Sequence, residues 1–267
     1  MIKMTNIYKP TACEILSIKS ESPIEWLFRV KTNIKPEPGQ FIQVSIPKVG
    51  EAPISVAGYN IEEGWIEFLI RKVGKVTDAI FNLNPGDFLF LRGPYGNCFP
   101  LEQYTGKNLV IVAGGSGTAP VRPLIEKFIN DKITTVDLLL GFKDLNSVLF
   151  KDEILNWKKK SSMILTVDKG CGLDGECVGL VTEYIPQLKL INDIQNLEVV
   201  IVGPPIMMKF SALEFLKLGI PENQIWVSFE RNMSCAVGKC GHCKIDETYV
   251  CLEGPIFNYT KAKTLLD

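Results

Sequence analysis

The segment LVIVAGGSGTAPVRPLIEKFIND, residues 109–131, decides the fold class of this chain. It begins as a fully apolar strand, turns through a glycine loop and continues as an amphipathic helix. Uninterrupted apolar strands are typical of parallel sheets that are covered on both faces. Strand and helix continue to alternate downstream, which predicts a parallel-sheet α/β domain. Further strands are predicted at 135–142, 162–167, 198–202 and 224–229, and helices at 119–131, 151–160, 179–188 and 205–219.

The chain before this segment has a different pattern, in which short strands are divided by turn signals. The strands are rich in β-branched and aromatic residues, and Gly/Pro sequences such as NPGD separate them. Strands at this spacing predict a small antiparallel β-barrel. The predicted strands are 12–19, 26–31, 41–46, 65–71 and 87–92, with a short helix at 76–82.

The composition excludes several classes of protein. Of 267 residues, 46% are hydrophobic and 22% are charged, so the chain can bury a core. The net charge is −1, which gives no attraction to nucleic acid or to an acidic membrane. The N-terminus lacks a secretory signal, and no apolar run approaches the roughly 20 residues that span a bilayer. We therefore expect a cytoplasmic protein with no membrane insertion.

Four cysteines lie close together near the C-terminus with the spacing C-x4-C-x2-C-x7-C. The first part of this pattern is the plant-type [2Fe–2S] spacing. Structural zinc is an alternative, although it prefers two short C-x2-4-C pairs and this loop offers one. A disulfide is the third possibility, and a reducing compartment disfavours it. The predicted cluster ligands are Cys235, Cys240, Cys243 and Cys251.

The single histidine of the chain, His242, restricts the chemistry further. A Rieske centre needs two histidines, so that kind of cluster is excluded. The loop GGSGT lacks the last glycine of the G-x-S-x-G elbow, which argues against Ser–His–Asp hydrolysis. We therefore expect cofactor chemistry and predict no catalytic acid or base.

The other four cysteines are scattered. Cys13 and Cys98 are interpreted as small hydrophobic residues. Cys171 and Cys177 lie in the sequence CGLDGEC and could form a redox pair, although we favour the interpretation as two incidental thiols in a loop.

Glycine loops supply the candidate nucleotide site. Residues 114–118 follow an apolar strand and open a helix, where free N–H groups can meet phosphates. The match to G-x-G-x-x-G fails at Pro120, and glycines in such turns also serve steric roles. A second loop, residues 203–205, follows the strand at 198–202, and ligands bind at such carboxyl ends. In the barrel, residues 74–77 could bind phosphate, or Thr77 could simply cap the short helix.

Taken together, the barrel, the glycine-loop domain and the cysteine spacing resemble the ferredoxin–NADP reductase superfamily. The closer resemblance is to its branch of electron-transfer subunits with a C-terminal [2Fe–2S] loop. Residues 226–263, WVSFERNMSCAVGKCGHCKIDETYVCLEGPIFNYTKAK, resemble the B-subunit family of anaerobic sulfite reductases. The resemblance covers essentially the whole chain. It implies a flavin-binding barrel at 1–104, an NAD-binding α/β domain at 105–229 and a small cluster lobe at 230–267.

The resemblance also implies roles for individual residues. The flavin motif of the family, R-x-[YF]-S, falls on residues 52–55, where this chain has alanine in place of arginine and isoleucine in place of the aromatic residue. Arg71 is the nearest replacement for the missing charge. The implied flavin residues are Ala52, Pro53, Ile54, Ser55, Leu69, Ile70, Arg71, Gly74, Val76 and Thr77. The implied nicotinamide-nucleotide residues are Gly114, Gly115, Ser116, Gly117, Thr118, Gly203, Pro204, Pro205 and Met207.

A flavin is needed between the nicotinamide nucleotide and the cluster, because nicotinamide gives electrons in pairs and an iron–sulfur cluster accepts them singly. The expected route is NADH, flavin, [2Fe–2S] cluster and partner, with FAD favoured over FMN. The segment 143–148 lacks an arginine for a 2′-phosphate, which favours NADH over NADPH, although Lys143 could serve. The resemblance implies iron–sulfur and sirohaem subunits that reduce sulfite to sulfide as partners. Alternatives are an electron-transfer subunit of a hydrogenase or dihydroorotate dehydrogenase, and a nucleotide-binding regulator stapled by zinc.

Overall fold

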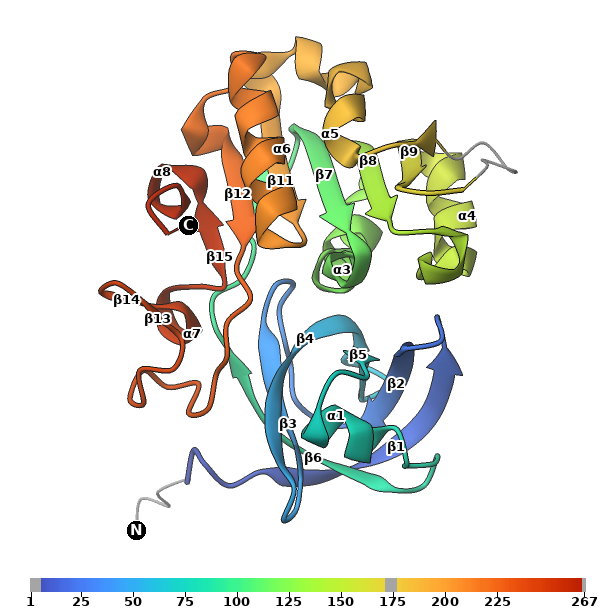
Figure 1. The fold of residues 1–267 in the computed structure, drawn as a ribbon, viewed down its shortest axis with the longest axis vertical. Helices are drawn as coiled ribbons and strands as arrows, with labels where there is room; N and C mark the ends of the chain where they lie inside the picture. Colours follow the sequence, from blue (N-terminus) through green and yellow to red (C-terminus); the bar gives the residue numbers. More distant parts are fainter. Residues whose placement is uncertain (1–5, 171–176, 266–267) are drawn as a thin grey trace.

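The N-terminal part of the chain closes into a six-stranded antiparallel barrel (Figure 1). It belongs to a computed structural model that describes residues 6–170 and 177–265. The strand order around the barrel is β1-β2-β5-β4-β3-β6. The strands are β1 (Thr11–Ser20), β2 (Glu25–Lys31), β3 (Phe41–Ile46), β4 (Gly50–Asn60), β5 (Trp65–Arg71) and β6 (Phe88–Tyr95), and the helix α1 (Lys75–Ile80) follows β5. The predicted barrel is confirmed.

Strand β4 is the one barrel strand absent from the sequence prediction. Its sequence, GEAPISVAGYN, contains two glycines and a proline, which normally argue against a central strand. The structure nevertheless pairs β4 with β3 on one side and β5 on the other, with a bulge between Val56 and Gly58. The strand carries the whole of the implied flavin motif.

A seven-stranded sheet forms the second part of the molecule, in the order β10-β9-β8-β7-β11-β12-β15. The five predicted strands, β7, β8, β9, β11 and β12, are parallel as expected. The sheet also contains two strands that were not predicted, β10, which is parallel to β9, and β15, which is antiparallel to β12. The strands are β7 (Asn108–Gly114), β8 (Thr135–Phe142), β9 (Ser162–Val167), β10 (Cys177–Val178), β11 (Leu197–Val202), β12 (Ile225–Ser228) and β15 (Ile256–Asn258). The helices are α2 (Leu101–Tyr104), α3 (Thr118–Phe128), α4 (Lys151–Lys160), α5 (Val181–Tyr184) and α6 (Pro205–Lys217).

The predicted helix at 179–188 is wrong in length. Only the four residues of α5 are α-helical, and a 3-10 turn at Ile185–Gln187 replaces the rest. Pro186 explains the break, because proline has no N–H group with which to continue the hydrogen bonds of the α-helix. Other 3-10 turns are Gly115–Gly117, Leu145–Ser147, Leu190–Asn192, Ile194–Asn196 and Glu222–Gln224.

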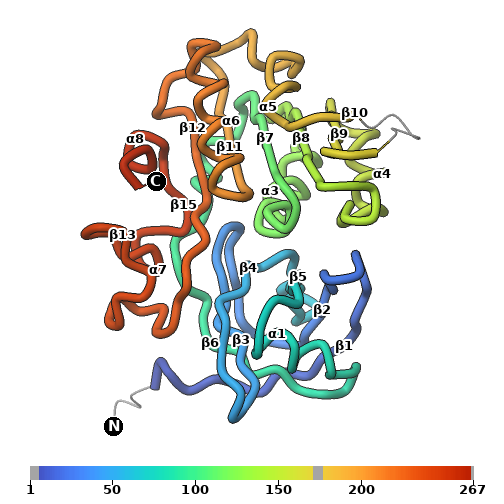
Figure 2. Tube along the Cα trace, in the orientation of Figure 1, coloured from blue at the N-terminus to red at the C-terminus, as the bar shows by residue number. Residues whose placement is uncertain are grey.

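The sheet is buried on both faces. Leu124 of α3 and Trp157 of α4 pack with one face, and Phe215 of α6 packs with the other. The second core continues into the cysteine-rich segment, where it includes Cys243 and Cys251. Figure 2 shows the C-terminal segment beside β12 and next to the barrel. Within the described ranges, no helix has the length and apolar character needed to cross a membrane.

The segment after residue 230, the expected cluster lobe, contains several short helices and strands. It contains β13 (Lys244–Ile245), β14 (Thr248–Tyr249), α7 (Val250–Glu253) and α8 (Tyr259–Ala262), besides β15. Phe257 of β15 packs against Phe229 with ring centroids 5.5 Å apart. Strand β15 thereby anchors the cysteine-rich segment to the edge of the parallel sheet.

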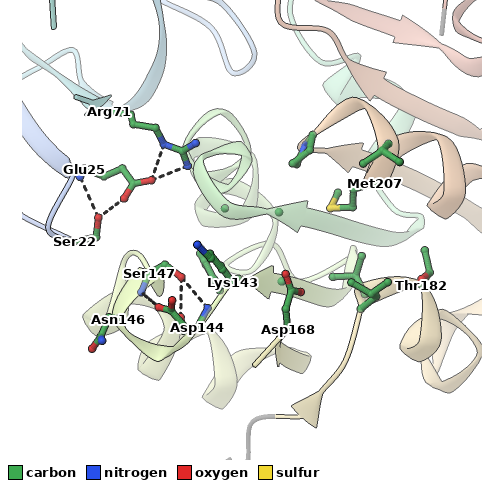
Figure 3. Close-up of a pocket in the computed structure, with 18 of the residues that line it drawn as sticks. Ser22, Glu25, Arg71, Lys143, Asp144, Asn146, Ser147, Asp168, Thr182 and Met207 are labelled. Atoms are coloured by element: carbon green, nitrogen blue, oxygen red, sulfur yellow. Dashed lines mark hydrogen bonds and ion pairs between the residues drawn. The ribbon is translucent and has the colours of Figure 1, made fainter. Parts of the chain in front are cut away.

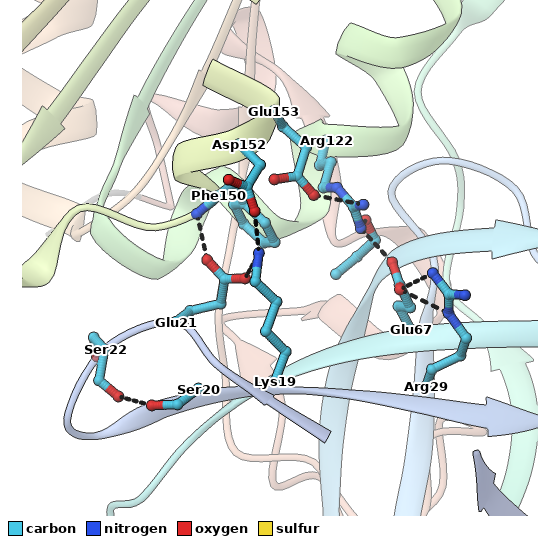
Figure 4. A network of polar contacts seen from close by, with 11 residues as sticks. Lys19, Ser20, Glu21, Ser22, Arg29, Glu67, Arg122, Phe150, Asp152 and Glu153 are labelled. Carbon is cyan, nitrogen blue, oxygen red and sulfur yellow. Dashed lines mark hydrogen bonds and ion pairs between the residues drawn. The ribbon is translucent and has the colours of Figure 1, made fainter. Parts of the chain in front are cut away.

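Ion pairs hold the barrel against the sheet (Figure 4). Arg122 of α3 contacts the buried Glu67 of β5 and also Glu153 of α4, the latter at 2.9 Å. Glu67 is only 3% exposed and is paired a second time, with Arg29 at 2.8 Å. Another ion pair connects Lys19 of β1 to Asp152 of α4 at 2.9 Å. These contacts place the carboxyl ends of the parallel strands opposite the barrel.

Candidate functional site

A cleft of about 1010 Å³ lies between the barrel and the carboxyl ends of β7, β8 and β11 (Figure 3). The barrel lines it with residues 22–25 and Arg71. The sheet side contributes Gly114, Gly115 and residues 141–144, together with Pro204 and Met207. Open α/β sheets bind ligands in crevices at this edge.

The two predicted glycine loops meet at the sheet side of this cleft. A Cβ added to Gly117 would lie 2.6 Å from the carbonyl oxygen of Val202 and 2.8 Å from the Cα of Gly203. The loops after β7 and β11 therefore pack backbone against backbone, which gives Gly117 a steric role. Gly115 has a φ of +54° and lies on the cleft itself. Thr118 is fully buried beneath the loop.

Arg71 contributes a positive charge at the barrel side of the cleft. Its Nη2 lies 2.7 Å from Oε1 of Glu25, which is 3% exposed, and Ser22 contacts the same carboxylate. The guanidinium also faces the glycine loop, because a Cβ on Gly115 would lie 3.7 Å from Nη2. A guanidinium has five N–H donors, so the pair with Glu25 leaves others available for an anionic ligand.

The implied flavin motif lies along β4 and outside the lining of this cleft. Pro53 of β4 is paired in register with Gln43 of β3, and Ile54 is half-buried against the barrel core. The hydroxyl of Thr77 accepts from the N–H groups of Val73 and Gly74 at 3.0 and 3.1 Å. Thr77 is the third residue of α1 and Gly74 is its N-cap, so the expected N-cap at Thr77 is wrong; its hydroxyl instead accepts from the N–H of the N-cap residue.

The cysteine loop has the chemistry of a cluster site. Cys243 and Cys251 are buried, whereas Cys235 is half-buried and Cys240 is exposed. The N–H group of Lys239 lies 3.3 Å from the sulfur of Cys235. The N–H groups of Val237 and Gly238 point at the sulfurs of Cys235 and Cys251, at 3.4 and 3.3 Å. Backbone amides around thiolate sulfurs are the environment that an iron–sulfur cluster uses.

The pKa values of two thiols in the loop are shifted in opposite directions. Backbone N–H groups, chiefly that of His242, lower the pKa of Cys240 to about 7. Burial and then a contact with Cys243 raise the pKa of Cys251 to about 12. Because burial favours the neutral thiol of Cys251, metal binding must supply the free energy that deprotonates it. Within residues 6–170 and 177–265, no three His, Cys, Asp or Glu side chains converge as the ligands of one ion.

The remaining cysteines lie elsewhere. Cys13 is buried in the barrel core, as its interpretation as a small hydrophobic residue requires. Cys98 is half-buried, and its pKa is raised to about 11 by burial and by Glu37. Cys177 begins β10, whereas Cys171 lies outside the described residues. The suggested redox pair stays untested.

The sequence interpretation included Arg71 but missed residues 22–25, which are the rest of the barrel contribution to the cleft. Residues 22–24 lie in the turn between β1 and β2 and Glu25 begins β2, and nothing in SESPIE distinguishes a ligand-facing turn from any other. Asp144 also lines the cleft beside Lys143, and its carboxylate accepts from the N–H of Ser147 at 2.9 Å.

Three family models match consecutive parts of the chain. Residues 15–99 match the oxidoreductase FAD-binding domain, and residues 111–212 match the oxidoreductase NAD-binding domain. Residues 230–263 match the iron–sulfur cluster binding domain of dihydroorotate dehydrogenase B. An FAD-binding, an NAD-binding and an iron–sulfur-binding part thus follow one another in the order that the resemblance implies.

Relatives and solved structures agree with this division. Sulfhydrogenase 2 subunit gamma of Pyrococcus furiosus is 33% identical, with 96% of this chain and 97% of that protein covered. A probable dihydroorotate dehydrogenase B (NAD(+)) electron transfer subunit of Methanocaldococcus jannaschii is 32% identical over 96% of this chain and 92% of its own length. A chain of an NADH-dependent reduced ferredoxin–NADP oxidoreductase shares the fold, with a TM-score of 0.77, 23% identity and coverage of 95% and 92%. This chain therefore belongs to the family of ferredoxin–NADP reductase-like oxidoreductase subunits that carry FAD-binding, NAD-binding and iron–sulfur-binding domains and act in electron transfer.

Proposed function

We propose that the protein oxidises NADH and passes the electrons, one at a time, through flavin and a [2Fe–2S] cluster to a partner subunit. One observation carries this proposal. The cleft is bordered by β2 and β5 residues of the barrel, whereas the cysteine loop contacts β3 and β6. Strand β4, with the flavin motif, stands between these pairs in the barrel order. A flavin on β4 would lie between the nucleotide and the cluster.

The residues of this chain would bind and orient the cofactors. Bound flavin would supply the conversion of a hydride pair into single electrons. Arg71 and the 74–77 loop would hold its phosphate, and residues 52–55 would contact its ring. The loops 114–118 and 203–207 would hold the nicotinamide nucleotide. The four cysteines would hold the cluster. We assign these roles to segments 1–104, 105–229 and 230–267, the last of which also extends the parallel sheet through β15.

The cysteine spacing and the amides that point at sulfur support a two-iron cluster. A [2Fe–2S] cluster is held by four thiolates shared between two irons, and C-x4-C-x2-C is its plant-type spacing. A closed zinc site needs four ligands arranged as a tetrahedron about one ion. NADH is favoured because Asp144 faces the cleft, where an acidic side chain suits a free ribose hydroxyl and repels a 2′-phosphate.

The electron acceptor is best sought among hydrogenase and dihydroorotate dehydrogenase catalytic subunits. The relatives above are named as subunits of such enzymes and match this chain over almost its whole length. The sulfite reductase partners expected from residues 226–263 find no support in these relatives, so sulfite reduction becomes the weaker possibility.

Purification of the natural complex tests this proposal. The tagged chain is isolated anaerobically with its partner and supplied with NADH. Protons, orotate and sulfite are offered in turn as acceptors. We expect NADH-dependent turnover with protons or orotate. Turnover with sulfite and with neither other acceptor would support the sulfite reductase subunit that residues 226–263 resemble. A chain isolated without a redox partner would contradict the role as a subunit.

A further inference from the structure

We propose that Arg92 is a positioning residue that fixes the first cluster ligand, Cys235, against the flavin strand β4. This inference rests on the proposed function, because it assumes that the four cysteines hold a cluster. It assigns a role to a barrel residue outside the cleft and outside the cysteine loop.

Arg92 lies on β6 and is 6% exposed. Its Nη1 donates to the carbonyl oxygen of Cys235 at 2.8 Å, and its Nη2 donates to that of Ser234 at 2.7 Å. An arginine seldom lies so deep unless its charge is compensated. Here Nε donates to Oε2 of Glu51 at 3.0 Å, and Nη2 contacts the other oxygen of the same carboxylate.

Glu51 connects this contact to the flavin strand. It lies on β4 directly before Ala52, the first residue of the implied flavin motif. One planar guanidinium therefore bridges the flavin strand and the backbone of a cluster ligand. Arginine suits this role because its donors form a rigid fork, whereas lysine offers a single point charge.

A neighbouring barrel residue continues the same row of contacts. Gln43 of β3 is fully buried and is paired in register with Arg92. Its Nε2 donates to the carbonyl oxygen of Met233 at 3.1 Å. Three consecutive carbonyls, those of residues 233, 234 and 235, thus accept hydrogen bonds from barrel side chains.

The other end of the loop is held in the same way. Asn97, just after β6, donates through Nδ2 to the carbonyl oxygens of Glu253 and Ile256 at 2.9 and 2.8 Å. Its Oδ1 accepts from the N–H of Ile256 at 3.0 Å. The chain is therefore fixed to the barrel shortly before Cys235 and shortly after Cys251.

This arrangement separates the two sides of the loop backbone. The carbonyls before and at Cys235 face the barrel, whereas the following N–H groups of Val237 and Lys239 face its sulfur. Amide donors aimed at a thiolate stabilise it and fix its orientation. Arg92 would hold this geometry in place before the cluster is inserted.

Iron release from the holoprotein tests the proposal. Arg92→Gln and Arg92→Lys are compared with the wild type under anaerobic conditions in the presence of an iron chelator. Arg122→Gln is the matched control, because Arg122 is a mostly buried arginine, with a side chain 14% exposed, that pairs with carboxylates and donates to the backbone carbonyl of Ala57. Its contacts lie at the other side of the barrel. Flavin content reports whether each variant is folded.

We expect Arg92→Gln to release iron about tenfold faster, because the loss of one charge-assisted hydrogen bond is worth about 1.4 kcal/mol or more. Arg92→Lys should lie between Arg92→Gln and the wild type, and Arg122→Gln should release iron at the wild-type rate. The electron paramagnetic resonance spectrum of the reduced cluster should change in Arg92→Gln while the flavin absorption stays the same. A general structural role would not produce that combination.

Wild-type iron release and an unchanged resonance spectrum in Arg92→Gln would overturn this inference alone. If Arg92→Gln does not fold, the half-exposed Glu51 is replaced instead, and Glu51→Gln should also speed iron release; an unchanged rate there would overturn the inference. A wild-type protein that binds flavin and contains no iron would overturn the proposed function together with it.

Discussion

Arg71 and Glu25 form an ion pair at the cleft, with Nη2 of Arg71 2.7 Å from Oε1 of Glu25. Because Ala52 occupies the position of the family arginine, Arg71 is the charge expected to hold the flavin phosphate. A charge-assisted hydrogen bond is worth about 1.5–3 kcal/mol, so Arg71→Ala should weaken flavin binding by roughly 10- to 150-fold. Flavin dissociation measured by fluorescence checks this, with Arg71→Lys as the charge-conserving control.

The outcome also depends on the pose of the flavin. Ala52→Arg should tighten flavin binding if the flavin lies as the family motif implies. Retention of flavin by Arg71→Ala at the wild-type level would show that Arg71 serves only its pair with Glu25.

The ion pair between Arg122 and Glu67 should contribute to stability because it is buried. Its carboxylate side chain is 4% exposed, and Arg122→Ala would leave Glu67 with Arg29 alone. Removing one partner of a buried pair typically costs about 3 kcal/mol or more. Urea unfolding should show a loss of about 3 kcal/mol for Arg122→Ala. Lys217→Ala, which breaks an exposed pair with Glu214, should cost less than about 0.5 kcal/mol. Equal effects of the two variants would contradict this account.

Cys240 offers a way to separate the cluster from the fold. Its side chain is exposed, so Cys240→Ser should leave the packing of the loop intact while it removes one thiolate ligand. We expect iron content to fall to near zero and the rate of flavin reduction by NADH to be preserved. Cys98→Ser, in a half-buried thiol outside the loop, should keep its iron. Loss of both iron and flavin reduction in Cys240→Ser would mean that the loop is a structural staple.

Glu198 should make the stability of the protein depend on pH. It is 5% exposed, and burial raises its pKa although Trp226 and Gln103 donate to it. A raised folded-state pKa gives stability that is complete below the unfolded value of about 4.3 and is lost as the pH rises through the folded value. Glu198→Gln cannot ionise, so it should gain stability relative to the wild type as the pH rises above the unfolded value of about 4.3. Urea unfolding across this range checks it, and a constant difference between the two proteins would count against the prediction.

The sequence predicted those parts of the fold in which one strand or helix carries its own signal. The apolar strands β7, β8 and β11 are examples, because burial on both faces demands the composition seen there. Strand β4 was not predicted because Pro53 and the glycines are unfavourable in an ordinary strand. They are accommodated here by the pairing with β3 and β5 and by the bulge, which depend on the neighbouring strands. Helix α5 was overextended because the apolar residues after it suggested one continuous helix past Pro186.

The candidate site was predictable to the extent that its motifs are local. The cysteine loop and the glycine loops are short, and their spacing alone suggests their ligands. Contacts such as that of Arg92 with the carbonyl of Cys235 join residues far apart in the sequence. Neither partner has an unusual sequence context, so only the folded arrangement shows that they meet.

The most direct test of the central claim is an anaerobic titration of the purified chain with NADH, followed by absorption from the near ultraviolet to the visible. The account predicts flavin and iron–sulfur bands in the oxidised protein, with one flavin and two irons with acid-labile sulfide per chain. Both sets of bands should bleach as NADH is added, and Cys240→Ser should lose only the iron–sulfur part. A colourless protein with stoichiometric zinc and no bleaching by NADH would contradict it.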